Sequence, residues 1–175
     1  GKPERMDQGV SLLAGATFAG FAPAVRISAE KLLPLLSRMD AVVPHKEALA
    51  DFFLKSDNTE TQHVEELVAA VASGNKKAIQ GLAEKIEVDP LVLHFVAGFV
   101  VAPVLHALTS LVASSGDEAP WDTGDVWRQG YCPMCGALPT MGWMDKPAID
   151  DKNAFLAGGG GKKHLYCGTC GADWK

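Results

Sequence analysis

The sequence predicts a mainly α-helical fold, with a bundle-like helical domain over residues 1–120 and a small β-hairpin module over residues 121–175. Three observations predict this division. Apolar residues follow a helical period before residue 114, a polar break containing Gly and Pro covers 114–120, and every cysteine comes after that break. Hydrophobic residues make up 47% and charged residues 21% of the chain, which is typical of a globular protein.

Two helices are expected in the first third of the chain. They cover residues 29–43 and 45–54, and Pro44 separates them because proline cannot continue a helix. Pro34 lies inside the first of these segments. We expect it either to kink that helix or to mark its true start.

Two further helices are expected over 64–71 and 79–86, where apolar residues recur at helical spacing. Thr59 and Gln62 can form a capping box at the start of the first of them, because hydroxyl and amide groups satisfy free backbone donors there. The tripeptide 73–75, Ser-Gly-Asn, predicts the end of one helix and the start of the next.

The segment 91–113 has no charged side chain and is long enough to cross a bilayer. Two histidines and a proline interrupt it, and no Lys or Arg cluster flanks it as an anchor. Asp89 and Pro90 precede it as an N-cap and a first helical residue, a pairing common in soluble helices. We therefore predict the buried central helix of a bundle and no stable membrane insertion.

The four cysteines form two Cys-x-x-Cys pairs, Cys132 with Cys135 and Cys167 with Cys170, each preceded by Tyr and followed by Gly. Two intervening residues let a tight turn present both thiolates to one ion, and the glycine permits backbone angles closed to other residues. The sequence therefore predicts one tetrathiolate site per chain. Four thiolates suit zinc and iron equally, so both metals stay open.

The stretch between the two pairs is longer than in a usual zinc ribbon. Residues 138–144 and 163–166 can form the arms of a hairpin, with a disordered glycine-rich tip at 158–161. Three other interpretations of the cysteines remain: redox-active dithiols, a fortuitous pairing, or an iron centre that carries electrons. Trp143 and Trp174 are expected to pack over this module.

Charge and motif content exclude several classes of function. The formal net charge of -5 gives no broad attraction to phosphate backbones, so we predict no nucleic-acid partner. The sequence has no phosphate-binding loop, nucleophile elbow or histidine–carboxylate metal motif, so we predict no enzyme and no catalytic residue. His94 and His106 are expected to be core or helix-face residues, and His164 to have no free ligand position. The clustered cysteines favour a reducing compartment, which we take to be the cytoplasm.

The cysteine module resembles the formate dehydrogenase accessory protein family, known as FdhE. The resemblance is carried by Cys132-Pro-Met-Cys-Gly-Ala-Leu-Pro139, by His164-Leu-Tyr-Cys-Gly-Thr-Cys170 and by Trp174. It implies a helical N-terminal part joined to a rubredoxin-like four-cysteine module over residues 121–175. It also implies that Cys132, Cys135, Cys167 and Cys170 hold one zinc or iron ion, with no cofactor beyond the metal.

The same resemblance implies a function. Members of that family are cytoplasmic chaperone-like proteins that bind the catalytic subunit of formate dehydrogenase and support its maturation. The family pattern continues with two further Cys-x-x-Cys pairs, whereas this sequence ends at Lys175, so we expect a fragment or a short homologue. The alternatives are a zinc-ribbon module that contacts protein or nucleic acid, and a rubredoxin-like electron carrier with a redox-active site.

Overall fold

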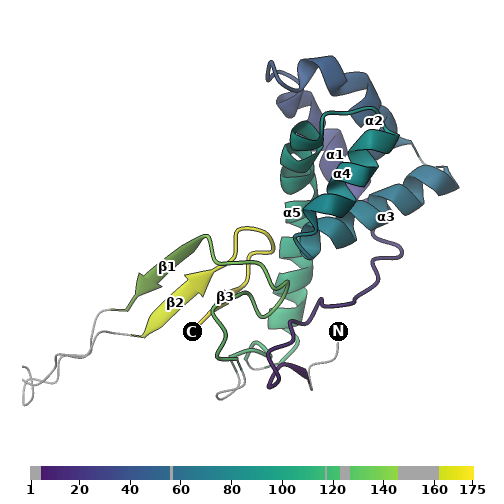
Figure 1. Cartoon of the computed structure of the whole chain (residues 1–175). Coiled ribbons are helices and arrows are strands. Elements are labelled where there is room, and N and C mark those ends of the chain that lie inside the picture. The colour runs from purple at the N-terminus through teal and green to yellow at the C-terminus, as the bar shows by residue number, and fades with distance from the viewer. Residues whose placement is uncertain (1–4, 56, 117, 123–126, 146–161) are drawn as a thin grey trace, which may run out of the picture.

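The computed structural model describes residues 5–55, 57–116, 118–122, 127–145 and 162–175 (Figure 1). A helical part is followed by a small antiparallel sheet, so the predicted mainly α fold with a β module is confirmed. In chain order the described elements are α1 (Ala22–Leu36), the 3-10 helix η2 (Val43–His45), α2 (Lys46–Leu54), α3 (Asn58–Ala72), α4 (Lys76–Lys85), α5 (Pro90–Ala113), β1 (Met141–Met144), β2 (Lys163–Tyr166) and β3 (Asp173–Trp174).

The first helix differs from the expected one at both ends. It begins at Ala22 rather than residue 29, because Pro23 occupies the first turn, where a missing N–H costs nothing. It ends at Leu36 rather than residue 43, and Pro34 lies in its last turn without starting or stopping it. The segment around Pro44 forms η2, which includes His45, and the next helix, α2, covers the other predicted residues, 46–54.

Helix α3 has a different N-cap from the predicted one. The side chain of Asp57 accepts a hydrogen bond of 2.8 Å from the backbone N–H of Glu60, and Thr59 already lies inside the helix. The predicted capping box of Thr59 and Gln62 is therefore wrong. A threonine hydroxyl could also accept such a bond, but a carboxylate at the cap in addition interacts favourably with the helix dipole.

The break between α3 and α4 is confirmed at residues 73–75. Gly74 adopts a φ of 63°, a left-handed conformation that glycine reaches without strain. Asn75 then caps α4, because its side-chain oxygen accepts a hydrogen bond of 3.1 Å from the N–H of Ala78. The two helices lie against each other and both pack against α5.

Helix α5 begins as predicted. Asp89 Oδ1 accepts hydrogen bonds from the N–H groups of Leu91 at 2.8 Å and Val92 at 3.3 Å. One face packs against α1, α3 and α4, as expected of a central helix. The opposite face is not buried, since Leu91 is 80%, Phe99 50% and Leu111 69% exposed. The helix is long and apolar enough to cross a bilayer, a property that core helices of soluble proteins share.

The small sheet has the order β1-β2-β3, and both pairs of neighbouring strands are antiparallel. Trp143 lies opposite His164, and Leu165 opposite Trp174. The predicted hairpin arms are confirmed, although the first strand begins at Met141 rather than residue 138. The predicted tip at 158–161 lies outside the described residues.

The buried residues of the helices and of the cysteine module belong to one hydrophobic cluster. The segment before α1 contributes to it with Met6, Leu12 and Phe18. Figure 1 shows this N-terminal segment running below α3, in the lower half of the view, where the sheet also lies on the other side of α5. The domain boundary at residue 120 stays a prediction.

Candidate metal centre

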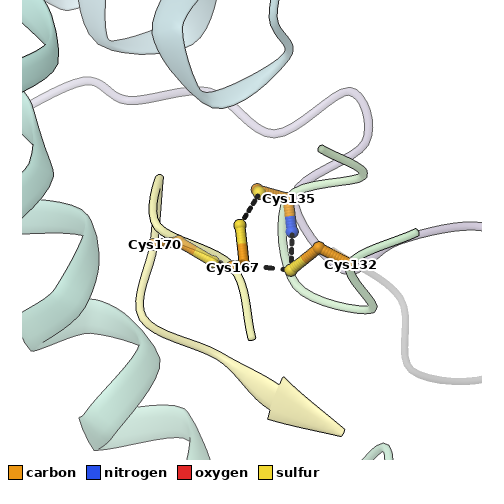
Figure 2. A group of neighbouring side chains, drawn as sticks. All are labelled: Cys132, Cys135, Cys167 and Cys170. Carbon is orange, nitrogen blue, oxygen red and sulfur yellow. Dashed lines mark hydrogen bonds between the residues drawn. The ribbon is translucent and has the colours of Figure 1, made fainter. Parts of the chain in front are cut away.

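The four cysteine side chains point toward one another from two separate loops (Figure 2). All four Sγ atoms lie within 4.8 Å of one another, and all four residues are buried. Two of the distances, Cys132 to Cys170 and Cys135 to Cys167, are 3.5 Å, far longer than a disulfide bond of about 2.05 Å. Tetrahedral sulfurs about 2.3 Å from an ion lie about 3.8 Å apart, so the group could hold one metal ion.

The first knuckle, residues 132–137, is a closed loop of two backbone hydrogen bonds. The N–H of Gly136 donates to the carbonyl of Cys132 at 2.9 Å, and the N–H of Cys132 donates to the carbonyl of Ala137 at 2.8 Å. Gly136 has a φ of 83°, which turns the chain back after the second cysteine. The N–H of Cys135 also points at Cys132 Sγ, 3.5 Å away, and would stabilise a thiolate there.

The second knuckle, residues 167–172, repeats this loop. The N–H of Gly171 donates to the carbonyl of Cys167 at 2.8 Å, and the N–H of Cys167 donates to the carbonyl of Ala172 at 2.9 Å. Gly171 has a φ of 77°. The shared sequence Tyr-Cys-x-x-Cys-Gly-Ala thus produces two loops of the same form, which face each other across the sulfurs.

The N-terminal segment holds the first knuckle. The N–H groups of Leu12 and Leu13 donate hydrogen bonds of 2.8 Å to the carbonyls of Pro133 and Met134. These carbonyls belong to the two residues between the cysteines, so the segment binds the turn itself. The hydroxyl of Tyr131 donates a further bond of 2.6 Å to the carbonyl at position 9.

Helix α5 holds the second knuckle through His106. Its Nε2 lies 3.3 Å from the carbonyl oxygen of Gly168, and its ring covers Gly171 so closely that a Cβ there would lie 2.8 Å from Nδ1. The N–H of Gly168 donates to Thr140 Oγ1 at 3.0 Å. The second knuckle is therefore fixed by side chains, whereas the first is fixed mainly by backbone.

Tryptophans surround the module, as expected for Trp174, which is buried. Its Nε1 donates to the carbonyl of Gln129 at 3.3 Å, and Trp121 Nε1 donates to the carbonyl of Asp173 at 2.8 Å. Trp143 is 42% exposed and stacks on His164 with ring centroids 5.0 Å apart. It covers the hairpin rather than the sulfurs.

The histidines do not join the sulfur group. His106 contacts the second knuckle, His94 lies on the exposed face of α5, and His164 pairs with Asp145 at 2.8 Å. Within the described residues, the cysteines alone form a group of potential metal ligands. The contacts of His106 and of the N-terminal segment were not predicted, because no local sequence signal distinguishes these residues.

The pKa values of the four cysteines shift because their sulfurs lie against one another. Hydrogen bonds with the other three sulfurs, together with burial, raise the pKa of Cys135. The hydrogen bond with Cys135 lowers the pKa of Cys132, but the bonds with Cys167 and Cys170 and burial outweigh it and raise this pKa as well. Hydrogen bonds from Cys132 and Cys135 lower the pKa of Cys167 and that of Cys170. The four sulfurs of the metal-free protein therefore hold and release protons as one group.

The arrangement suits an ion bound by four protein ligands, which leaves no coordination position open for a substrate. Convergence of both pairs favours metal binding over two independent dithiols, each of which would function without the other. No protein-family model, curated protein or solved structure matches this chain.

Proposed function

We propose that this protein is a metal-binding accessory protein, which binds the catalytic subunit of a formate dehydrogenase and supports its maturation. Cys132, Cys135, Cys167 and Cys170 hold one zinc or iron ion. The observation that carries the proposal is the single buried group of four sulfurs, formed by loops that are anchored to two distant parts of the chain.

The ion has a structural role in this proposal. The sheet has three short strands, one of only 2 residues, and such a sheet has little core of its own. Metal binding can supply about 10 kcal/mol or more of folding free energy to a small site of this kind. The ion would thereby fix the knuckles against the N-terminal segment and α5.

The proposal of a formate dehydrogenase partner is supported by where the residues that resemble the FdhE family lie in the fold. Residues 132–139 form the first knuckle and the chain after it, and residues 164–170 form most of β2 and most of the second knuckle. These two stretches meet at the sulfurs, with Trp174 buried beside them. The four unpaired cysteines suit the reducing conditions of the cytoplasm, where we place the protein.

Metal analysis and visible absorption of anaerobically purified protein separate the two metals. We expect one ion per chain. A colourless protein with zinc supports the structural role, whereas a coloured iron protein with reversible redox behaviour would favour the electron-carrier alternative.

Binding of the purified full chain to a purified formate dehydrogenase catalytic subunit tests the partner. We expect a complex that requires the ion, because chelation releases both knuckles. Reproducible absence of binding to immature and mature forms of the subunit would overturn the proposed function.

A further inference from the structure

A groove lies between α1 and α5 and reaches the second knuckle. Two adjoining cavities of about 450 Å³ and 740 Å³ form it, and both are lined by Leu32 and Pro103. The end of the groove near the metal site is lined by His106 and Gly168. Gly168 directly follows Cys167, so the groove and the candidate metal centre share one wall.

The groove exposes apolar surface that the fold leaves uncovered. Ile27 is 57% and Phe99 50% exposed, on α1 and α5 respectively. Gly98 and Ala102 line it as small residues of α5, and a Cβ added at Gly98 would meet nothing within 4 Å. Exposed apolar surface in a concave site indicates a binding surface, and small residues on its floor let another backbone approach closely.

The charge of the groove differs from that of the whole chain. The protein has 21 acidic and 16 basic residues, yet no carboxylate of the described residues lines either cavity. Its ionisable lining residues are Lys31 and His106. The groove therefore complements a ligand that is apolar and carries negative charge.

The shape of the groove favours a peptide helix over a membrane. Its floor on α5 runs from Gly98 to Ala107, about 14 Å at the rise of an α-helix. This length accommodates two to three turns of a partner helix, with apolar anchors at positions such as i, i+3, i+4 and i+7. A flat bilayer surface would leave the concave floor unfilled.

We propose that this groove binds an apolar helical segment of the partner protein that carries an acidic residue, which pairs with Lys31. The inference rests on the proposed function, because it makes the groove the contact site for the formate dehydrogenase catalytic subunit. The second knuckle contributes Gly168 to the wall of the groove, so loss of the ion would change the shape of the contact. Loss of the ion would then weaken binding without any ligand of the metal touching the partner.

Binding of the purified catalytic subunit to variants of the full chain tests this contact. Ile27→Glu should weaken the affinity for the catalytic subunit at least tenfold, because the introduced carboxylate would repel the acidic residue of the partner. The new carboxylate lies one helical turn from Lys31, which α1 tolerates. Leu111→Glu is the matched control: Leu111 is 69% exposed on α5 and lines neither cavity, so its variant should bind within twofold of the wild type.

Substitutions of Lys31 test the charge. Lys31→Glu should weaken binding about as much as Ile27→Glu, whereas Lys31→Arg should preserve it. A photo-crosslinking residue at position 27 should label an apolar segment of the catalytic subunit that contains Asp or Glu. Labelling of a basic segment would overturn the inference. Metal content and circular dichroism of each variant show whether it is folded.

The outcomes separate this inference from the proposed function. Equal binding by wild type, Ile27→Glu and Lys31→Glu would exclude the groove but leave the function standing. No binding by the wild type would overturn both. Flotation of the wild type with phosphatidylcholine vesicles, lost in Ile27→Glu, would assign the face to a lipid surface instead and overturn the peptide assignment.

Discussion

The two cysteine knuckles have nearly the same local structure but different surroundings. Each closes with one hydrogen bond to the carbonyl of its first cysteine and one from that cysteine's N–H. The first is held by backbone bonds from Leu12 and Leu13, whereas the second is held by His106 and Thr140. The shared sequence Tyr-Cys-x-x-Cys-Gly-Ala therefore determines the conformation of each loop, while the rest of the chain determines which segment anchors it.

Because the two knuckles are anchored to different segments, metal binding should affect more than the site itself. An ion that joins the knuckles would connect the N-terminal segment, through the first, to α5, through the second. Metal binding should therefore stabilise contacts between segments that lie far apart in the sequence. Substitutions in each knuckle can test whether the two are equivalent as ligands and unequal in their anchors.

The largest effect is expected from loss of a ligand. Cys132→Ser and Cys167→Ser should each lower metal affinity by at least about a hundredfold, because a hydroxyl replaces a thiolate in a four-ligand site. Metal analysis after dialysis measures this. Amide hydrogen exchange should show Leu12 and Leu13 losing protection in both variants, while most helical circular dichroism remains.

Thr169→Ala is the matched control, because Thr169 lies in the second knuckle between the cysteines without contributing a sulfur. It should keep the ion. Full protection of Leu12 and Leu13 in metal-free Cys167→Ser protein would contradict the proposed connection between the knuckles.

The protons held by the sulfur group predict a pH dependence of metal affinity. The raised pKa values of Cys132 and Cys135 keep these thiols protonated near neutral pH, so the ion must displace their protons. Affinity should therefore fall as pH falls, by about tenfold per unit for each proton released. Proton release on zinc addition, followed with an indicator dye, checks this; an affinity independent of pH would contradict it.

The knuckle glycines should differ in their tolerance of a side chain. Both adopt positive φ, which costs an alanine about 1–2 kcal/mol. A Cβ at Gly136 would lie 3.1 Å from Ser11 Oγ, a hydroxyl that can rotate away, whereas at Gly171 it would meet the His106 ring at 2.8 Å. Gly171→Ala should therefore lower the free energy of unfolding more than Gly136→Ala, as thermal or urea unfolding would measure.

A double-mutant cycle isolates the contribution of the ring. His106→Ala should cost about 1 kcal/mol through the lost hydrogen bond, and Gly171→Ala should cost less in that background than in the wild type. Strict additivity would show that the imidazole does not limit the space at Gly171.

The smallest effect is expected from the hydroxyl of Tyr131. Tyr131→Phe removes its 2.6 Å hydrogen bond to the carbonyl of Gly9 and should lower the free energy of unfolding by about 1 kcal/mol. Metal content should not change. Loss of the ion in this variant would mean that the N-terminal segment is needed to form the site, rather than only to anchor it.

Local signals made much of this structure predictable from the sequence. The Asp89 cap, the 73–75 break and both cysteine turns each depend on a few adjacent residues. The start of α1 and the cap at Asp57 were missed because more than one nearby residue can serve these roles. A sequence pattern predicts that a helix or strand forms more reliably than it predicts the first residue of that element.

The contacts that anchor the two knuckles could not be predicted from local sequence patterns. Residues 5–18 have no helical or strand period, and their hydrogen bonds reach more than a hundred positions along the chain. His106 fits an apolar helix equally well as a surface residue. Its contact with Gly168 depends on where the second knuckle packs, which only the tertiary structure determines.

The bonds from Leu12 and Leu13 to the first knuckle also bear on synthesis. The ribosome releases the segment around Leu12 and Leu13 long before the first knuckle, and longer still before Cys167 and Cys170. The segment cannot form its hydrogen bonds to the first knuckle until that knuckle has been synthesised. The site therefore cannot close before residue 170 has been synthesised. An ion bound by all four sulfurs would therefore identify molecules in which the N-terminal segment and the second knuckle lie in their final positions.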